Sequence, residues 1–433
     1  MAYDTVRSSQ TSRRQFLKTS AAAAVAGSIA AQLAVPPTAH AAGSDILKIG
    51  LIGCGGRGNG AAAQALNADK NTHLVALADA FEDRVKGGFD SLKKQFKDRV
   101  TATPDTCFVG FDAYQKVIDA GVDVVVLTSP PHFRPAHLKA AVAAGKHIFT
   151  EKPMAVDAPG VRSVMETVEE AKKKNLNMVA GFCWRYHFAH RETFKRLQDG
   201  AIGPVTNVYS TYNTGGLWNH GRKPAWSDME WQVRNWLYFT WLSGDHIVEQ
   251  AVHSIDKMAW AHQDVPPNKA IAHGGRQVRT DPAYGNIYDH FSIVYEWPND
   301  SRGFLYCRQQ DGCASGVWDH ITGAKGVCNI SSGNSYVIKG EAEWRYAGPP
   351  NDMYQTEHDE FFAAIRAGKI INDGARMMNS TMMAILGRMA AYTGQVITWE
   401  QALNSKEDLT PAKYEWGPIP TPAVALPGKT KFI

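Results

Sequence analysis

A glycine-rich loop between an apolar run and a helical stretch constrains this chain more than any other feature. The run Ile46–Ile52 has the composition of a buried parallel strand. It leads into G-x-G-x-x-G at Gly53, Gly55 and Gly58, and Asn59–Ala68 then shows a helical pattern. Such glycines permit a tight turn, let the backbone approach a pyrophosphate, and let helix and strand pack closely. The order of strand, loop and helix predicts a dinucleotide-binding unit rather than a structural glycine-rich turn.

An acidic residue at the end of the next predicted strand supports this prediction. The strand His73–Ala78 is followed by Asp79, about 20 residues after the last glycine. A carboxylate there accepts hydrogen bonds from ribose hydroxyls and repels the 2′-phosphate of NADP. Arg57 and Arg84 lie nearby in sequence and could weaken that preference. We expect NAD, with NADP less favoured, in a site formed by Gly53, Gly55, Gly56, Arg57, Gly58 and Asp79.

Strands and helices continue to alternate after Asp79. Helical patterns cover Phe111–Ala120 and Pro135–Ala144, and strand patterns cover Val122–Thr128 and His147–Thr150. This alternation predicts an α/β fold with a doubly wound parallel sheet. Ligands bind beyond the carboxyl ends of such strands. Two of these ends lead into Thr128-Ser129-Pro130-Pro131 and Glu151-Lys152-Pro153.

The N-terminus has the order of an export signal. A twin-arginine motif, Ser12-Arg13-Arg14-Gln15-Phe16-Leu17-Lys18, precedes the apolar stretch Ala21–Val35 and the small-x-small site Ala39-His40-Ala41. These parts in this order predict a twin-arginine signal peptide over residues 1–41. A single membrane anchor, or a chance arginine pair in a disordered tail, is the alternative. The export interpretation implies a periplasmic protein that leaves the cell interior folded, with its cofactor already loaded.

The charge balance excludes some classes of partner. The chain has 433 residues and a formal net charge of +4. Most of that excess lies in the signal segment, so the remaining surface is close to neutral. We therefore expect no nucleic acid, and no membrane after signal removal, as a partner. The six cysteines form no C-x-x-C motif, and their disulfide status stays open.

Four motifs together carry a family resemblance. They are Gly50-Leu51-Ile52-Gly53-Cys54-Gly55, Thr128-Ser129-Pro130-Pro131 with His137, Ala144-Gly145-Lys146-His147 leading to Glu151-Lys152-Pro153, and Gly181-Phe182-Cys183-Trp184-Arg185-Tyr186. The combination resembles the glucose–fructose oxidoreductase, inositol dehydrogenase and rhizopine-catabolism (Gfo/Idh/MocA) family. The resemblance implies a Rossmann domain followed by an α+β domain with an open, mostly antiparallel sheet that helps form the substrate site and often an oligomer contact.

The resemblance also suggests domain limits and further site residues. We expect a NAD-binding Rossmann domain over 45–175, an α+β substrate and oligomerisation domain over 176–410, and an extended C-terminal arm over 411–433. Period-2 patterns over Phe291–Trp297 and Gly303–Gln309 predict strands of the second sheet, and Glu357–Ala367 and Arg376–Tyr392 predict helices. The implied cofactor contacts are Ser129, Pro130, His137, Glu151 and Lys152. The implied substrate contacts include Arg185 and Tyr186.

Lys152 is the first candidate catalytic residue. In the family the matching lysine lies near both nicotinamide and substrate. The residues agree, since a lysine at the end of a strand, beside a proline that fixes the turn, can reach into the cleft and hold a hydroxyl oxygen. The alternative is a surface lysine in a salt bridge.

Glu249 and His253 are the second candidates. They are four residues apart, Asp256 is three further on, and on one helix the three side chains share a face. His253 matches the proton-accepting histidine of the family, while Glu249 stands where the family usually has aspartate. His253 could instead be a buried structural histidine. A metal on Asp245, His246, Glu249 and His253 is a rival interpretation, although we expect none.

Half of the 12 tryptophans fall between residues 218 and 260. Indole faces stack on the C–H faces of sugar rings. We expect some of these tryptophans, with Trp218 and Trp236 foremost, to contact a carbohydrate together with His253, and the others to lie in the core or in an oligomer contact.

These observations predict an exported, homo-oligomeric, NAD-dependent oxidoreductase that acts on a hydroxyl of a sugar, cyclitol or glycoside with a tightly held cofactor. One alternative is a redox-neutral lyase, glycosidase or epimerase working through a transient keto-sugar. A second is a non-catalytic sugar-binding protein, against which the intact phosphate loop and Lys152 argue.

Overall fold

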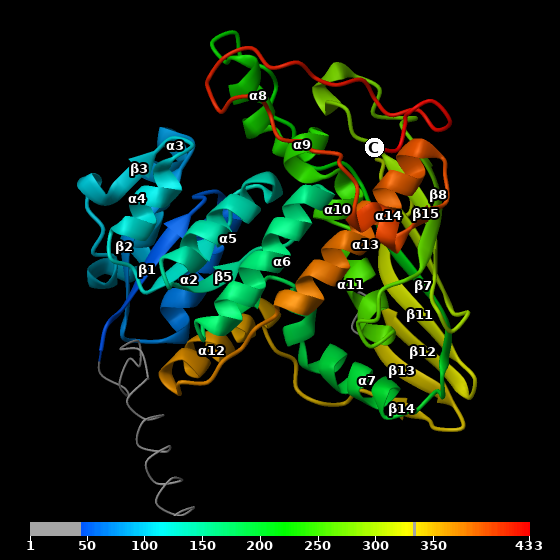
Figure 1. Ribbon diagram of the computed structural model, residues 1–433. Helices are drawn as coiled ribbons and strands as arrows, with labels where there is room; N and C mark the ends of the chain where they lie inside the picture. Colours follow the sequence, from blue (N-terminus) through cyan, green and yellow to red (C-terminus); the bar gives the residue numbers. More distant parts are fainter. Residues whose placement is uncertain (1–44, 332–334) are drawn as a thin grey trace, which may run out of the picture.

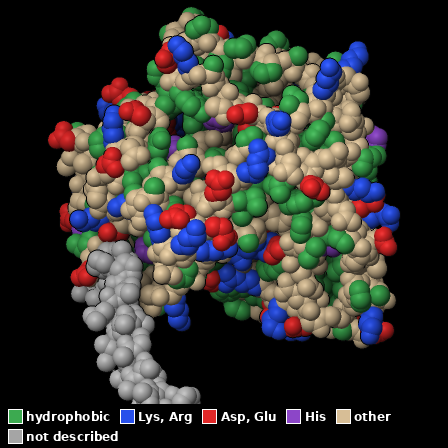
Figure 2. Space-filling view, viewed as in Figure 1, with side chains coloured by type: hydrophobic (Ala, Val, Ile, Leu, Met, Phe, Trp, Pro, Cys, Tyr) green, Lys and Arg blue, Asp and Glu red, His purple; other side chains and the backbone are tan. Residues whose placement is uncertain are grey.

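The computed structural model describes residues 45–331 and 335–433, which form two sheets with helices packed around and between them (Figure 1). The predicted signal peptide, residues 1–41, lies outside the described residues. Within the described ranges no helix is both long enough and apolar enough to cross a membrane. Figure 2 shows Lys and Arg interspersed with Asp and Glu on the face viewed.

The first sheet is parallel and has six strands in the order β3-β2-β1-β4-β5-β6. The strands are β1 (Leu47–Ile52), β2 (Thr72–Asp79), β3 (Cys107–Val109), β4 (Val124–Leu127), β5 (His147–Thr150) and β6 (Met178–Ala180). The order reverses between β1 and β4, and a crevice for a ligand opens at such a switch point. The predicted doubly wound parallel sheet is therefore confirmed, with β3 as a strand that the sequence patterns had not indicated. Strand β6 lies beyond residue 175, where we had placed the domain limit.

Helices cover both faces of this sheet. On one face lie α2 (Gly56–Ala68), α3 (Glu82–Phe96) and α12 (Met353–Arg366), and on the other lie α4 (Ala113–Asp119), α5 (Arg134–Ala143) and α6 (Ala158–Lys173). Along β4 the alternate residues Val124 and Val126 pack with the first group, and Val125 and Leu127 pack with the second. This two-sided burial explains why the parallel strands are continuous apolar runs.

The second sheet has nine strands in the order β14-β13-β12-β11-β7-β10-β9-β8-β15. They are β7 (Val205–Thr214), β8 (Lys269–Gly275), β9 (His290–Glu296), β10 (Arg302–Gln309), β11 (Gly316–Gly323), β12 (Gly326–Ser331), β13 (Ser335–Gly340), β14 (Trp344–Arg345) and β15 (Ile397–Thr398). All neighbours are antiparallel except β7 and β10. The mostly antiparallel second sheet is thus confirmed. Helices α7 (Phe188–Gln198), α11 (Val252–Ala261) and α13 (Gly374–Thr393) pack against one of its faces (Figure 1).

Helix α13 joins the two sheets. It packs on α6 of the first domain and on β8 and β9 of the second, and its buried residues belong to one core that is continuous through both. Arg388 of α13 is fully buried, donates a hydrogen bond to the carbonyl oxygen of Val156 at 2.6 Å, and pairs with Glu407 at 2.6 Å. The two domains are therefore held together by shared core packing and by a buried arginine.

Short helices and an extended segment lie beside the carboxyl ends of the parallel strands. The helices are α8 (Asp228–Arg234), α9 (Thr240–Ser243) and α10 (His246–Glu249), all between β7 and α11. After α14 (Trp399–Leu403) the described chain has no further helix or strand. The C-terminal segment, red in Figure 1, runs past α9 and α8 before it returns toward α14. These elements lie where a cofactor or substrate would meet the second domain.

Candidate cofactor and catalytic site

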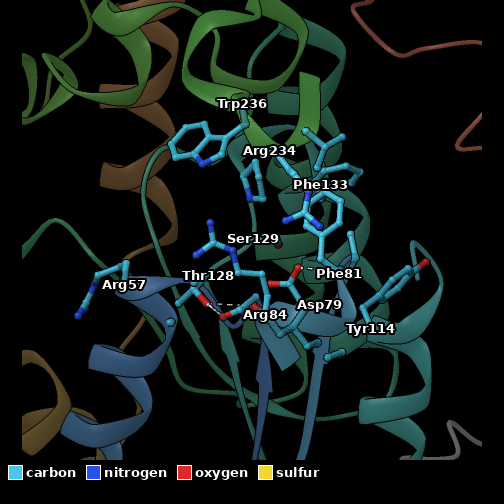
Figure 3. Close-up of a pocket in the computed structure, with 18 of the residues that line it drawn as sticks. Arg57, Asp79, Phe81, Arg84, Tyr114, Thr128, Ser129, Phe133, Arg234 and Trp236 are labelled. Carbon is cyan, nitrogen blue, oxygen red and sulfur yellow. Dashed lines mark hydrogen bonds between the residues drawn. The ribbon is translucent and has the colours of Figure 1, made fainter. Parts of the chain in front are cut away.

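A cavity of about 490 Å³ lies at the carboxyl ends of β1, β2, β3 and β4 (Figure 3). Its first wall is the glycine-rich loop with the residues that follow the strands: Asp79, Phe81, Arg84, Phe111, Tyr114, Thr128, Ser129, Pro130, Phe133 and His137. Its second wall comes from the segment before α9 and consists of Trp218, His220, Val233, Arg234 and Trp236. The structure thus brings most of the predicted cofactor residues together around one space.

The glycine-rich loop leaves an open cradle in this cavity. Gly53 has a φ of +99°, which favours glycine, and a Cβ at Gly58 would lie only 1.8 Å from the carbonyl oxygen of Gly53. A Cβ at Gly55 or Gly56 would meet no atom within 4 Å. Gly53 and Gly58 therefore shape the turn, whereas Gly55 and Gly56 keep space free at the N-terminus of α2. A pyrophosphate fits this space because backbone N–H groups and the helix dipole favour an anion there.

Asp79 presents a carboxylate at the end of β2. One oxygen accepts a hydrogen bond from the backbone N–H of Cys54 at 2.7 Å, and the other accepts one from Phe81 at 3.1 Å. Burial raises the pKa of Asp79, while these two bonds and the charge of Arg84 oppose that rise. Each carboxylate oxygen can accept more than one hydrogen bond. Asp79 is therefore fixed by the loop and still able to accept ribose hydroxyls.

Aromatic side chains form the rest of the first wall, and the sequence prediction missed them. Phe81 follows β2 and Phe111 follows β3, while Tyr114 lies in the first turn of α4 and Phe133 directly precedes α5. His137 stacks on Tyr114 with ring centroids 4.3 Å apart. A usable signal was present, because each aromatic side chain lies just after a strand, where α/β folds bind ligands.

Ser129 and His137 hold each other at the cavity edge. Ser129 Oγ lies 3.0 Å from His137 Nδ1. Burial, helped by the charges of Arg134 and His132, lowers the pKa of His137 to about 3, so its imidazole is neutral at ordinary pH. The neutral ring can hydrogen-bond to Ser129 and still stack on Tyr114.

Arg57 and Glu151 pair with each other. The Arg57 guanidinium forms an ion pair with Glu151 and a second one, at 3.2 Å, with Glu357 of α12, and its side chain points away from Asp79 and Ser129 in Figure 3. Burial would raise the pKa of Glu151, but Arg57 and Lys152 lower it overall. Arg57 also lines the cavity, whereas Glu151 does not, so the ion pair lies at the edge of the cofactor space.

Lys152 and Glu249 meet at the junction of the two domains. The half-buried Lys152 donates a hydrogen bond from Nζ to the backbone carbonyl of Glu249. The Glu249 carboxyl is buried and accepts a hydrogen bond from Gln309 Nε2 at 3.4 Å. Burial raises the pKa of Glu249 to about 7, although the charge of Lys152 opposes the rise. A carboxyl with this pKa can both accept and release a proton near neutral pH.

His253 lies beside this pair in an aromatic enclosure. Its ring is 5.6 Å from the ring of Trp184, 6.5 Å from that of Tyr212 and 6.3 Å from that of Phe182. Burial and the charges of Lys152 and Lys257 hold its pKa well below the usual value, so the ring is neutral. In the described part of the chain neither ring nitrogen has a hydrogen-bond partner. We call Lys152, Glu249 and His253 the proton-transfer group, after the role that we propose for them, and none of the three lines the cavity.

The helix expected through Glu249, His253 and Asp256 is interrupted. Helix α10 ends at Glu249, α11 begins at Val252, and Gln250 has φ −118° and ψ −59° at the break. Asp256 is buried and pairs with Arg185 at 2.8 Å. The expectation that the three share one helix was therefore wrong, because Glu249 ends α10 while His253 and Asp256 both lie on α11.

Arg185 and Tyr186 serve the interior, contrary to the prediction that they contact substrate. Every guanidinium nitrogen of Arg185 donates to Asp256 or Asp264. Tyr186 is buried and donates from its hydroxyl to Asp373 at 3.0 Å. These bonds use the polar groups that a substrate would need.

The residues of the rival metal site have other partners. The Asp245 carboxylate accepts hydrogen bonds from the backbone of Tyr288 at 2.8 Å and from the hydroxyl of Tyr392 at 2.5 Å. His246 packs its ring against Phe291. Across residues 45–331 and 335–433, no three His, Cys, Asp or Glu side chains are placed to hold a metal ion.

The tryptophan-rich segment divides between cavity and core. Trp218 and Trp236 line the cavity, and Trp218 remains 43% exposed. Trp231 and Trp241 are buried, and Trp260 stacks on Phe194 with ring centroids 4.1 Å apart. Trp218 and Trp236 thus lie next to the cofactor space, where the second domain covers it.

The cavity therefore fits a dinucleotide through its cradle, its fixed carboxylate and its aromatic walls. Residues 47–182 match the model of the oxidoreductase family with the NAD-binding Rossmann fold, Gfo/Idh/MocA. Over these residues the chain carries the NAD-binding domain of the Gfo/Idh/MocA oxidoreductase family. Residues 10–30 match the signal sequence of the twin-arginine translocation pathway, as the sequence motif predicts.

Known proteins resemble the oxidoreductase over most of its length. An inositol 2-dehydrogenase of Rhizobium meliloti is 23% identical over 346 residues, which cover 76% of this chain and 92% of the relative. The structure of an aldose–aldose oxidoreductase from Caulobacter crescentus, complexed with glycerol, matches with a TM-score of 0.64 and 18% identity over 82% of this chain and 99% of the other. A levoglucosan dehydrogenase complexed with NADH and levoglucosan matches with a TM-score of 0.63 and 19% identity, again over 82% and 99%. The two structural matches show the shared fold.

Proposed function

We propose that this oxidoreductase is exported to the periplasm and uses a tightly held NAD to oxidise or reduce a hydroxyl-bearing carbon of a sugar, cyclitol or glycoside. The observation that carries the proposal is the proton-transfer group at the domain junction, combined with a dinucleotide cradle in the same molecule. The names of the relatives, which act on inositol, aldose or levoglucosan, support a ring or chain with several hydroxyl groups as substrate.

The preference for NAD over NADP rests on Asp79. Its carboxylate lies in the cavity and is fixed by two backbone N–H groups. A fixed negative charge pairs well with two ribose hydroxyls and poorly with a 2′-phosphate. Arg84 also lines the cavity and would reduce the discrimination without reversing it, because the carboxylate stays in place.

The polar residues at the domain junction suit proton transfer at a substrate oxygen. The ammonium of Lys152 has three donors and uses one on the carbonyl of Glu249, so two remain for a substrate hydroxyl. His253 has free ring nitrogens and is neutral, so it can accept the proton of that hydroxyl. Glu249, with a pKa of about 7, can take up that proton or hold a second hydroxyl. When bound, NAD supplies the nicotinamide ring that accepts or returns the hydride.

A periplasmic location explains why the cofactor would be retained. The signal sequence matches the twin-arginine pathway, which carries folded proteins, and free NAD is not expected outside the cytoplasm. An enzyme there benefits from entering with its cofactor and recycling it within the reaction. We also propose a homo-oligomer, because the second sheet leaves one face without covering helices (Figure 1).

The proposal is tested by the molecule that the purified protein carries. The protein is denatured, and the released small molecule is identified by mass and absorbance. We expect NAD. A preparation with only NADP, or one without measurable affinity for either nucleotide, contradicts the proposal.

The reaction class is tested on the holoenzyme. It is mixed with inositols, aldoses, anhydrosugars and simple glycosides while nicotinamide absorbance is followed. A lasting change in absorbance indicates net oxidation or reduction, whereas product formation without such a change indicates the redox-neutral alternative. No change and no product with any of them contradicts the proposed activity.

A further inference from the structure

The C-terminal arm, residues 411–433, passes over the outer side of the cofactor cavity and is fixed at both ends. Before the arm, Leu409 donates from its backbone to Asp157 at 2.9 Å. At the end of the chain, the carbonyl of Ile433 accepts hydrogen bonds from the Ser405 hydroxyl at 2.5 Å and from the Lys406 backbone at 3.1 Å. The arm therefore forms a closed strap that returns to its own starting point.

Two aromatic side chains of the arm pack behind the wall of the cavity. The ring of Trp416 lies 4.5 Å from the ring of Phe111 and 5.2 Å from that of Phe81. The ring of Tyr414 lies 5.8 Å from that of Phe111 and 5.9 Å from that of Phe133. Phe81, Phe111 and Phe133 all line the cavity. The arm thus touches the far side of the rings that would face the cofactor.

The arm also ties the two walls of the cavity together. On the first domain, the Tyr414 hydroxyl lies 2.7 Å from His132 Nε2. On the second, the carbonyl of Gly417 accepts from the backbone of Met229 at 3.0 Å, and that of Ile419 accepts from Gln232 Nε2 at 3.2 Å. Met229 and Gln232 belong to α8, which also supplies Val233 and Arg234 to the cavity lining. Movement of α8 away from β2 would break these bonds.

The cavity wall that contains Phe81 and Phe111 belongs to the adenosine half of the cofactor space. Asp79 at the end of β2 is placed to bind the adenosine ribose, and the pyrophosphate cradle lies at β1. Strand β3 is next to β2 on the side away from β1, so Phe111 after β3 lies beyond the ribose. The nicotinamide half must extend in the opposite direction, toward β4, β5 and Lys152.

We propose that the C-terminal arm is part of the cofactor site: Tyr414 and Trp416 position the aromatic wall around the adenosine half and slow the release of NAD. This inference rests on the proposed NAD-dependent function. Trp416 is 45% exposed, and without it Phe81 would lose its stacking partner, Phe111 would lose a tilted ring contact, and both rings would meet water. Loss of these two ring contacts loosens the aromatic wall and predicts about tenfold faster release of NAD.

The experiment measures release and affinity rather than activity. Holoenzyme of the parent, Trp416→Ala and Trp416→Phe is diluted into a competing nucleotide, and the dissociation of NAD is followed by fluorescence. AMP and nicotinamide mononucleotide are titrated into the stripped proteins as probes of the two halves. We expect Trp416→Ala to release NAD about tenfold faster, to lose AMP affinity by the same factor, and to keep the affinity for nicotinamide mononucleotide. The phenylalanine variant is expected to recover most of the difference.

Glu415→Ala is the matched control, because Glu415 lies between the two aromatic residues and its side chain is 73% exposed. It is expected to match the parent in every measurement. Parent-like release from Trp416→Ala overturns the inference, and so does an equal loss of affinity for both half-molecules, since that would indicate a generally loosened fold. If the parent itself binds no NAD, the proposed function fails first, and this outcome is distinguishable from a failure of the arm alone.

Discussion

The cofactor cavity and the proton-transfer group are assembled from different parts of the chain. The glycine-rich loop and Asp79, which form part of the cavity, come from a short stretch of sequence. The loop follows β1, and Asp79 ends β2. In the proton-transfer group, Lys152 follows β5, and Glu249 and His253 lie on either side of a break between two helices of the other domain. The hydrogen bond from Lys152 to the Glu249 carbonyl spans almost 100 positions of sequence.

This difference separates two kinds of chemistry. The cavity acts through backbone geometry, since N–H groups and the absence of side chains at Gly55 and Gly56 create its cradle. In the proposed function, the proton-transfer group works through side-chain pKa values that burial and neighbouring charges set. Substitutions in the cavity should therefore change cofactor affinity. Substitutions in the proton-transfer group should change the reaction rate while the cofactor stays bound.

Lys152→Ala is expected to show the largest effect and the clearest separation. Removing the ammonium at the reacting oxygen should lower kcat by about 10²–10⁴-fold. The variant should keep its fold and its bound NAD, because Lys152 does not line the cavity. Rates and cofactor content are compared with those of Lys139→Ala, a control at an exposed position on α5. Activity within a few-fold of the parent would mean that Lys152 is structural.

Glu249 and His253 should differ in their pH behaviour. Oxidation needs a proton acceptor, and Glu249 is ionised only above its pKa of about 7. We expect kcat/KM of the parent to rise with pH around that value. In Glu249→Gln this rise should be absent. The pKa of His253 is held well below its usual value, so His253→Asn should lower the rate by about 10²-fold and leave the rise with pH unchanged. If the pH dependence disappears in His253→Asn instead, the histidine and not Glu249 is the group that titrates in this range.

Protein stability gives a second measure of the same carboxyl. The pKa of Glu249 is raised from 4.5 to about 7 on folding, so the folded state binds the proton more tightly than the unfolded state. The free energy of unfolding should then fall as pH rises from about 4.5 to about 7. In Glu249→Gln this contribution should be absent, which denaturant titrations across that range can measure. An unchanged pH dependence in the variant would place the raised pKa elsewhere.

Some residues were accessible to sequence reasoning because their roles depend on local pattern. The roles of Gly53 and Gly58 in the turn were predictable from the local order of strand, loop and helix. In the structure both positions require glycine, as expected. The ion pairs of Arg57 could not be predicted, because its partners, Glu151 and Glu357, lie about 100 and 300 residues away in sequence. A charged residue in a phosphate loop has the same local pattern whether it faces the ligand or the interior.

Longer-range packing explains the other errors and omissions. Arg185 lies in a family-like motif, but a buried pair with Asp256 uses its donors. The role of Trp416 depends on contacts with Phe81 and Phe111, more than 300 positions earlier, and the arm itself has no regular pattern. Predictions succeeded where one stretch of chain determines the geometry and failed where tertiary partners decide it.

Gly55→Ala and Gly58→Ala should separate cofactor binding from folding within one loop. Gly55 has a φ of −71° and open space around its Cβ position, so alanine there should fold normally and intrude on the pyrophosphate. Overpacking of this kind costs about 1–3 kcal/mol, or roughly 5–150-fold in the Kd for NAD. At Gly58 the new Cβ would clash with the Gly53 carbonyl, so thermal stability should fall as well. Calorimetry and NAD titration measure the two effects.

Gly87→Ala on α3 is the control for both variants, because its Cβ position is open and lies outside the loop. It should leave NAD affinity unchanged. If Gly55→Ala also binds NAD like the parent, the cradle does not hold the pyrophosphate and the loop must be reassigned.

Asp79→Asn should show the smallest effect, a change in preference rather than a loss of binding. The amide keeps one acceptor oxygen and the approximate shape, but it removes the negative charge that faces the ribose. Loss of one charge-assisted hydrogen bond is worth about 1.5 kcal/mol, so the ratio of NAD to NADP affinity should fall about tenfold. Arg84 lines the same cavity and, without the opposing carboxylate, would be free to meet a 2′-phosphate, which should strengthen NADP while NAD weakens. The affinities for both nucleotides are measured by titration, with Asp90→Asn at an exposed position of α3 as control. An unchanged ratio would mean that Asp79 serves only to fix the loop through Cys54 and Phe81, and that the discrimination lies elsewhere in the aromatic wall.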